Sequence, residues 1–205
     1  MLTARKVAAA LASSDEEPAC QTSVALGELR TLNLAAAFEL MRLFPIAKVG
    51  LAGLGTSCRS NSTLRQQLDL LHSRRTDSGQ VVLAIYADHK RAGAPAPLEV
   101  LEIACRLGSR YVLIDTFIKD GQGLFQLLSI DELRRLGESA VAFGETLVLA
   151  GSLKSSDWPL LSQLDSVIVG VRGGVCTSDA DRSSRLSADR LRRWLEWSRT
   201  EAQLI

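Results

Sequence analysis

The sequence predicts an α/β protein built on a parallel β-sheet, and three observations point to this class. Short runs rich in β-branched residues alternate with longer segments whose apolar residues recur every three or four positions. The short runs are apolar along their whole length, which is typical of parallel strands covered by helices. Strand and helix signals follow one another regularly, which predicts repeated strand–helix units within a single domain at 1–205.

Six strands are expected, and most end beside a glycine or a charged residue. Their predicted ranges are 22–26, 46–51, 80–88, 111–115, 145–150 and 166–171.

The helices between these strands are marked by capping residues, prolines and glycines. A Ser-x-x-Glu capping box at Ser129 predicts a helix that ends at Gly144. Ser156 and Ser187 are expected to cap two further helices, while Ser60, Asn61 or Ser62 caps a helix that runs to about residue 75. The other predicted helices are 2–12, 29–44 and 98–107.

Composition excludes several classes of partner. With 205 residues, 23% of them charged, and a net charge of +1, the chain has no dense basic patch among aromatics, so nucleic acid is not an expected partner. No apolar run approaches about 18 residues, so no membrane partner is expected. The cysteines are isolated from one another and from histidine, which favours reduced thiols in a cytoplasmic protein without metal or other cofactor. These cysteines are Cys20, Cys58, Cys105 and Cys176.

Lysine is scarce among the 24 basic residues, of which only five are lysine. A GC-rich genome that favours arginine codons explains the bias as a whole. It leaves open why lysine is kept at particular positions, since lysine can act as a base or an imine-forming nucleophile and arginine cannot. The five are Lys6, Lys48, Lys90, Lys119 and Lys154.

The stretch 111–125 combines an apolar run with Asp115, Lys119 and a Gly-rich turn. The carboxyl end of a buried parallel strand is where α/β enzymes place catalytic side chains. A structural salt bridge at the strand end is the alternative. Tyr86 and Asp88, at the end of the strand before, are secondary candidates for the same site.

The last two strands each run into a turn of small residues. Gly151 and Ser152 follow one strand, and Gly173 and Gly174 follow the other. Exposed backbone amides in such turns favour anions, and phosphate binding after the last two strands is typical of (β/α)₈ barrels. Lys154 and Arg172 flank the turns, although the glycines could simply end the strands. A doubly wound sheet also remains open, but no GxGxxG follows a first strand.

Several segments together resemble one family. IAKVGLAG at 46–53, YADHKRAGA at 86–94, LIDTFIKDGQGLF at 113–125, LAGSLK at 149–154 and VGVRGGVC at 169–176 are similar in order and spacing to the (5-formylfuran-3-yl)methyl phosphate synthases. The resemblance implies a (β/α)₈ TIM barrel and an aldolase-like lyase. That lyase condenses two molecules of glyceraldehyde 3-phosphate, with loss of phosphate and water, for methanofuran-type cofactors of one-carbon metabolism.

The resemblance also implies roles for individual residues. Lys48 is similar to the family's proton-accepting lysine, and Asp115 and Lys119 to its acid and second amine. Lys154 and the two glycine turns are similar to its contacts with the phosphate of a sugar phosphate.

The family pattern begins with two strands and a Schiff-base lysine for which this chain shows no counterpart. We therefore expect a barrel of only six strand–helix units, whether from a misplaced start codon, a truncation or a real short form. Two exposed sheet edges would favour a homo-oligomer. A non-catalytic homologue that binds a sugar phosphate or a protein, and a different phosphate-handling barrel such as an isomerase, are the alternatives.

Overall fold

The computed structural model describes residues 21–55, 62–75, 79–178 and 184–202. The helix predicted at 2–12 and the caps predicted at Ser60 and Asn61 lie outside these residues.

The core of the fold is a six-stranded sheet in which every neighbouring pair of strands is parallel. The predicted strands are confirmed, with ends that differ by a few residues. They are β1 (Ser23–Glu28), β2 (Ile46–Gly50), β3 (Gln80–Tyr86), β4 (Tyr111–Asp115), β5 (Thr146–Leu149) and β6 (Val167–Val169).

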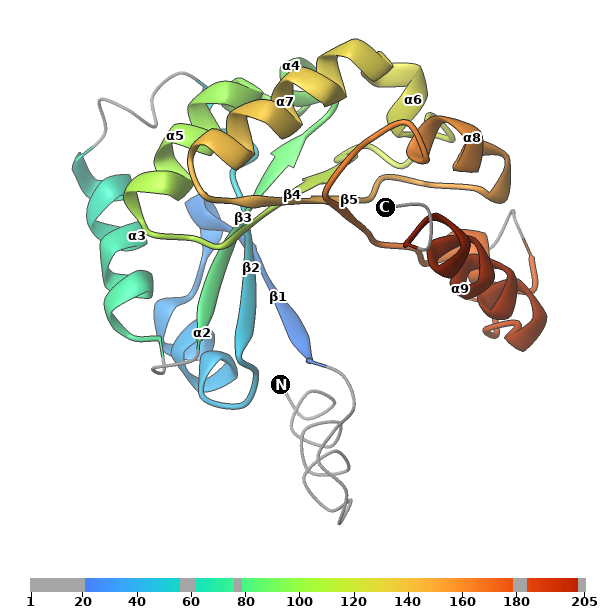
Figure 1. Ribbon diagram of the computed structural model, residues 1–205. Coiled ribbons are helices and arrows are strands. Elements are labelled where there is room, and N and C mark those ends of the chain that lie inside the picture. The colour runs from blue at the N-terminus through green and yellow to red at the C-terminus, as the bar shows by residue number, and fades with distance from the viewer. Residues whose placement is uncertain (1–20, 56–61, 76–78, 179–183, 203–205) are drawn as a thin grey trace.

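Helices connect the strands and lie outside the sheet (Figure 1). The longer ones are α2 (Leu34–Met41), α3 (Ser62–Ser73), α5 (Pro97–Arg106), α7 (Ile130–Ala142) and α9 (Ala188–Ala202). Shorter turns of helix are η1 (Leu29–Thr31), α4 (His89–Ala92), α6 (Leu124–Leu127), η3 (Ser155–Asp157), α8 (Trp158–Leu161) and η4 (Gly173–Val175).

Local capping explains where the helices begin. The capping box at Ser129 is confirmed, and the two hydrogen bonds from Ser129 lower the pKa of Glu132. The prediction of one helix over 29–44 is wrong, because the side chain of Asn33 accepts a hydrogen bond from Ala36 N at 3.1 Å and starts α2 at Leu34. Helix α4 was also not predicted, since the sequence there indicates only a loop.

Strand order decides between the two architectures left open by the sequence. The strands lie in chain order from β1 to β6, whereas a doubly wound sheet reverses its order at a switch point. The helices curve around one side of the sheet (Figure 1). This is a TIM-barrel-like arrangement, and within the described ranges β1 and β6 do not pair to close it.

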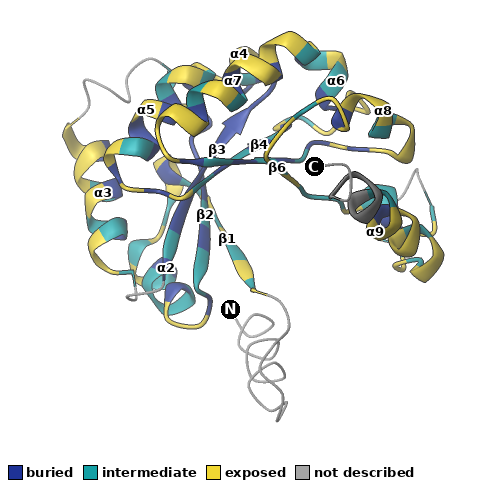
Figure 2. Cartoon of the chain, viewed as in Figure 1, coloured by how far each residue is buried: buried dark blue, intermediate teal, exposed yellow. Residues whose placement is uncertain are grey.

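The two faces of the sheet differ in burial, and so do its strands: Figure 2 shows the edge strand β1 less buried than β3. The main core lies between the outer face and the helices, and includes Leu83, Leu101, Leu133 and Leu149. On the inner face, side chains of β1, β2, β4, β5 and β6 are half-buried or exposed, and Ile168 is 45% exposed. Helices thus cover the outer face of the sheet, and only β3 is buried along nearly its whole length.

In the described part of the chain, no helix is both long and apolar enough to cross a membrane.

One buried carboxyl lies outside this apolar pattern. Glu145, just before β5, is 3% exposed, and neither of its carboxyl oxygens has a hydrogen-bond partner among the described residues. Burial raises its pKa to about 7, because the charged form is poorly solvated there. The folded chain therefore holds a proton on Glu145 that the unfolded chain releases near pH 4.5.

Replacing this carboxyl should change the pH dependence of stability. The contribution of Glu145 is complete below pH 4.5 and is lost as the pH rises through about 7. Glu145→Gln should thus match the parent protein at pH 4.5 and exceed its free energy of unfolding by about 2 kcal/mol at pH 8. Urea unfolding across this pH range measures the difference. Glu138→Gln, on the exposed side of α7, is the matched control, and an equal response of both variants would contradict the assignment.

Candidate functional site

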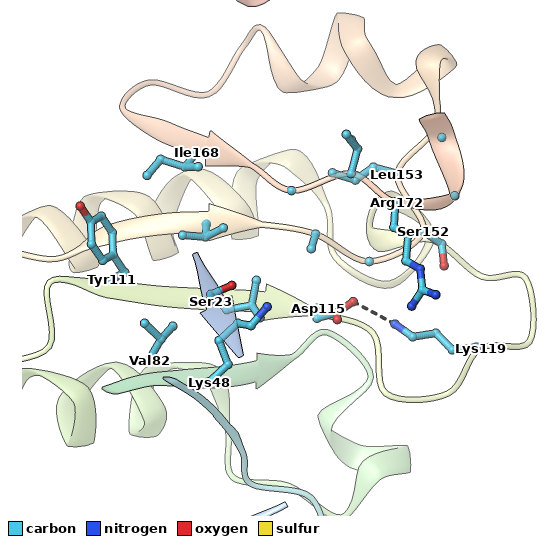
Figure 3. Close-up of a pocket in the computed structure, with 18 of the residues that line it drawn as sticks. Ser23, Lys48, Val82, Tyr111, Asp115, Lys119, Ser152, Leu153, Ile168 and Arg172 are labelled. Atoms are coloured by element: carbon cyan, nitrogen blue, oxygen red, sulfur yellow. Dashed lines mark hydrogen bonds and ion pairs between the residues drawn. The ribbon is translucent and has the colours of Figure 1, made fainter. Parts of the chain in front are cut away.

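The inner face of the sheet borders a cavity of about 720 Å³ that reaches the carboxyl ends of the strands (Figure 3). Its floor is apolar, formed by Ile46, Val82, Leu113, Val148 and Ile168. Its polar end brings together most of the residues singled out in the sequence: Lys48, Asp115, Lys119, Gly151, Ser152, Lys154, Arg172, Gly173 and Gly174.

The period of two along each strand explains why these residues meet. Tyr111, Leu113 and Asp115 alternate along β4, and all three border the cavity. On β2 the same alternation places Ile46 and Lys48 on this face. Because the strands are parallel, the side chains that follow their carboxyl ends gather at one edge of the cavity.

Lys119 and Asp115 form an ion pair at that edge (Figure 3). Lys119 Nζ lies 2.9 Å from Asp115 Oδ1 and 2.8 Å from Thr116 Oγ1, and it also donates to the carbonyl oxygen of Thr116. Three oxygen acceptors match the three donors of an ammonium group. These bonds hold the Lys119 amine in one position, and the side chains of both members of the pair remain one-third exposed.

Lys48 differs from Lys119 in its surroundings. It lies in the middle of β2, opposite Val82 of β3, and its side chain borders the cavity. No hydrogen bond or ion pair joins its amine to the described part of the chain. Two lysines with different surroundings therefore border one cavity.

The two turns after β5 and β6 pack against each other. Gly151 and Ser152 have left-handed backbones, with φ of +105° and +55°. A Cβ on Gly174 would lie 2.6 Å from the carbonyl oxygen of Leu153, so glycine lets the turns approach. Among the described residues, the amides of Ser152 and Leu153 meet no acceptor.

Positive charge surrounds these turns. Arg172 and Lys154 border the cavity from the β6 and β5 turns, and Lys119 lies at the same end of the strands (Figure 3). Unpaired amides together with three cations make this end of the cavity suited to an anion. In the part of the chain that is described, no three His, Cys, Asp or Glu side chains gather in a way that could hold a metal ion.

Comparison with known proteins now identifies the family. A family model described as 4-HFC-P synthase matches residues 2–195. The chain belongs to the 4-HFC-P synthase family.

Several relatives are named (5-formylfuran-3-yl)methyl phosphate synthase. The (5-formylfuran-3-yl)methyl phosphate synthase of Methanococcus maripaludis strain S2 is 33% identical over 177 residues, which are 82% of this chain and 72% of that protein. The protein of the same name from Methanopyrus kandleri is 38% identical over 130 residues, 63% of this chain and 54% of its own length. That of Methanosarcina barkeri is 39% identical over 106 residues, 52% and 45% of the two chains.

Two of the residues predicted for the site of this 4-HFC-P synthase family member, Tyr86 and Asp88, lie beside the cavity and do not border it. Asp88 is buried, and its carboxylate binds the backbone after β4. Tyr86 is 8% exposed, and its hydroxyl donates a 2.5 Å hydrogen bond to Glu28 Oε1. Burial and this hydrogen bond raise the pKa of Tyr86 above its usual range, so its hydroxyl keeps its proton.

Glu28 is a residue of this family member that sequence reasoning missed. It ends β1, and its carboxylate crosses over Gly50 of β2 to reach Tyr86 on β3, while Oε2 accepts a 2.7 Å hydrogen bond from Ala52 N. Its position immediately after an apolar strand was a usable signal. Because the strand was predicted to end at residue 26, Glu28 did not appear as a carboxylate at a strand end.

Gly50 should be essential to this link. A Cβ there would overlap both carboxylate oxygens of Glu28 and the hydroxyl of Tyr86. All three atoms are side-chain ends that can move aside, so Gly50→Ala should cost mainly the hydrogen bond between Glu28 and Tyr86 and lower the free energy of unfolding by about 1–2 kcal/mol. Adding Tyr86→Phe, which removes the hydroxyl, should relieve part of this loss.

Chemical denaturation of the single and double variants measures these effects. Gly137→Ala on α7 is the control, because a Cβ there meets only Leu147 Cδ1 at 4.0 Å, and it should stabilise the helix by about 0.5 kcal/mol. A Gly50→Ala variant as stable as the parent would show that Glu28 and Tyr86 are not held across this glycine.

Proposed function

We propose that this protein is an aldolase-like lyase that makes (5-formylfuran-3-yl)methyl phosphate from two molecules of glyceraldehyde 3-phosphate. One phosphate and water leave during the reaction, and the product serves methanofuran-type cofactors. The observation that supports this most is the combination, in one cavity, of three lysines, Arg172 and two glycine turns. Membership of a family whose relatives are named for this product supports the proposed product.

The turns after β5 and β6 supply the proposed phosphate site. The amides of Ser152 and Leu153 donate to phosphate oxygens, and Arg172 and Lys154 balance the negative charge. With the phosphate held there, the rest of a triose extends along the inner face toward Asp115 and Lys48. Fixing the substrate in this way lowers the entropic cost of the condensation.

Lys119 and Lys48 have different proposed roles. Lys119, already bonded to three oxygens, stabilises negative charge that develops on a substrate oxygen. Lys48 has no acceptor of its own among the described residues, so it moves the proton at the carbon beside the carbonyl. Asp115 holds the amine of Lys119 at the edge of the cavity.

The proposal extends to the fold and to the imine step. Two further strands of a (β/α)₈ barrel would pair with β1 and β6, whose outer edges have no partner among the described residues, and we propose a Schiff-base lysine on one of them. A lysine amine that attacks the aldehyde carbon releases water and leaves an imine that withdraws electrons from the neighbouring carbon. Borohydride reduction in the presence of glyceraldehyde 3-phosphate, followed by peptide mass spectrometry, identifies the lysine that carries the adduct.

Product analysis tests the proposed reaction. Protein incubated with glyceraldehyde 3-phosphate should release inorganic phosphate and form one product with the mass and ultraviolet absorption of a furan aldehyde. Release of dihydroxyacetone phosphate would point to an isomerase instead. Substrate binding without any turnover would point to a non-catalytic homologue.

A charge-conserving change at Lys48 tests its role as a base. Lys48→Arg keeps the positive charge, but a guanidinium cannot release a proton near neutral pH. The turnover number should therefore fall by about 100-fold or more, the usual size of a general-base contribution. Lys90→Arg, on the exposed side of α4, is the control and should retain activity. Unchanged turnover in Lys48→Arg would remove this residue from the mechanism.

A methyl group between the two turns tests the phosphate site. Gly174→Ala would place its Cβ 2.6 Å from the carbonyl oxygen of Leu153 and push the turns apart. The dissociation constant for inorganic phosphate, measured by calorimetry, should rise on the order of tenfold, because the amides no longer converge. Gly137→Ala should bind phosphate like the parent protein. Equal affinity in Gly174→Ala would place the phosphate elsewhere.

A further inference from the structure

The loop after β4 carries Lys119 and is bound along its length to the segment after β3. This loop, 116–122, has no regular secondary structure, yet it places an ammonium group beside Asp115. A flexible loop alone would not hold a lysine amine in one position. The contacts that fix it come from residues 86–91 on the neighbouring strand and helix.

Asp88 makes the central contact. Its Oδ1 accepts a 2.7 Å hydrogen bond from Phe117 N, and its Oδ2 accepts one of 2.9 Å from Ile118 N. Both oxygens of one buried carboxylate thus bind the two amides that immediately precede Lys119, and the side chain is 4% exposed. Charge-assisted bonds of this kind are among the stronger ones in proteins.

Asp88 lies at a position where its carboxylate could instead cap a helix. Asp88 is the residue before α4, where an aspartate normally caps its own helix. Here its side chain makes no capping bond to α4 and turns to the loop instead. The carboxylate therefore binds the loop after β4 and leaves α4 without a side-chain cap.

Three further contacts support the same loop. Ala87 N donates to Asp115 O at 2.8 Å and extends the strand pairing to the start of the loop. The rings of Tyr86 and Phe117 pack edge to face with centroids 5.1 Å apart. Arg91 binds the far end of the loop, through Asp120 Oδ2 at 2.5 Å and Gln122 Oε1 at 2.7 Å. The ion pair lowers the pKa of Asp120, but it is exposed and contributes little to stability.

We propose that Asp88 is a positioning residue that holds the 116–122 loop, so that the amine of Lys119 stays on Asp115 and faces the cavity. Asp88 does not border the cavity and is not expected to contact substrate. This inference rests on the proposed function for its effect on turnover, but its effect on the loop can be measured separately.

The test uses Asp88→Asn, because asparagine keeps the size of the side chain and offers only one oxygen acceptor. Its amide group would face a backbone N–H and leave one loop amide unbonded. Hydrogen exchange of the peptide that covers 116–122 should accelerate at least tenfold in Asp88→Asn. Asp131→Asn, which removes the same charge from the exposed start of α7, should exchange like the parent protein.

Chemical labelling of lysines gives a second readout. In the parent protein, trinitrobenzenesulfonate should modify Lys119 more slowly than the exposed Lys154, because its amine is held by three oxygens. In Asp88→Asn the Lys119 rate should rise severalfold relative to Lys154. The turnover number should also fall on the order of tenfold with little change in KM, since substrate contacts remain and a catalytic group is displaced.

Each outcome decides one point. A folded Asp88→Asn variant with unchanged exchange and unchanged Lys119 labelling would overturn the inference.

If that variant does not fold, hydrogen exchange in the parent protein tests the inference. The amides of Phe117 and Ile118 should then be protected relative to that of Gly121, which meets no acceptor among the described residues, and equal rates would overturn the inference. If the parent protein forms no furan product, the proposed function fails, whereas exchange and labelling still test Asp88.

Discussion

The parallel order of the strands is the constraint on which the proposed site depends. Six strands wound in sequence order bring six carboxyl ends to one edge of the sheet. The period of two then decides which side chains face inward, so that Lys48 and Asp115 border the same cavity although 67 positions separate them. A one-residue slip in the register of β2 or β4 would turn one of them toward the helices and dismantle the site.

Two carboxylates at strand ends, the half-buried Glu28 and the buried Asp88, connect neighbouring segments around the site. Glu28 links the ends of three strands, and Asp88 links β3 to the loop after β4. Neither carboxylate borders the cavity, but the backbone that Asp88 binds leads directly to Lys119, which does. Both carboxylates meet hydrogen-bond donors, whereas the buried Glu145 meets none among the described residues and keeps its proton up to about pH 7.

Much of this arrangement could be predicted from the sequence. The apolar runs indicated all six strands, and the glycine turns and scarce lysines indicated which loops carry chemistry. Which apolar strand residues face the open side could not be predicted from composition, because Val148 and Ile168 are as apolar as the residues that face the helices. Burial on that face depends on which strands stand opposite, and this is a property of the whole sheet.

The roles of Glu28 and Asp88 also required the structure. Asp88 was selected for its place at a strand end, yet its partners lie 29 and 30 residues away and are backbone amides, which carry no sequence signal. The link from Glu28 over Gly50 needs three strands in register. Local patterns indicate elements and their ends, whereas contacts between elements depend on how the chain packs.

The most direct test of the account is a crystal structure of the protein with glyceraldehyde 3-phosphate bound. We predict the phosphate at the amides of Ser152 and Leu153 beside Arg172, with the carbonyl carbon between Lys48 and the Asp115–Lys119 pair. A phosphate bound elsewhere, or a triose that leaves both lysines without contact, would contradict the assignment of this cavity as the catalytic site.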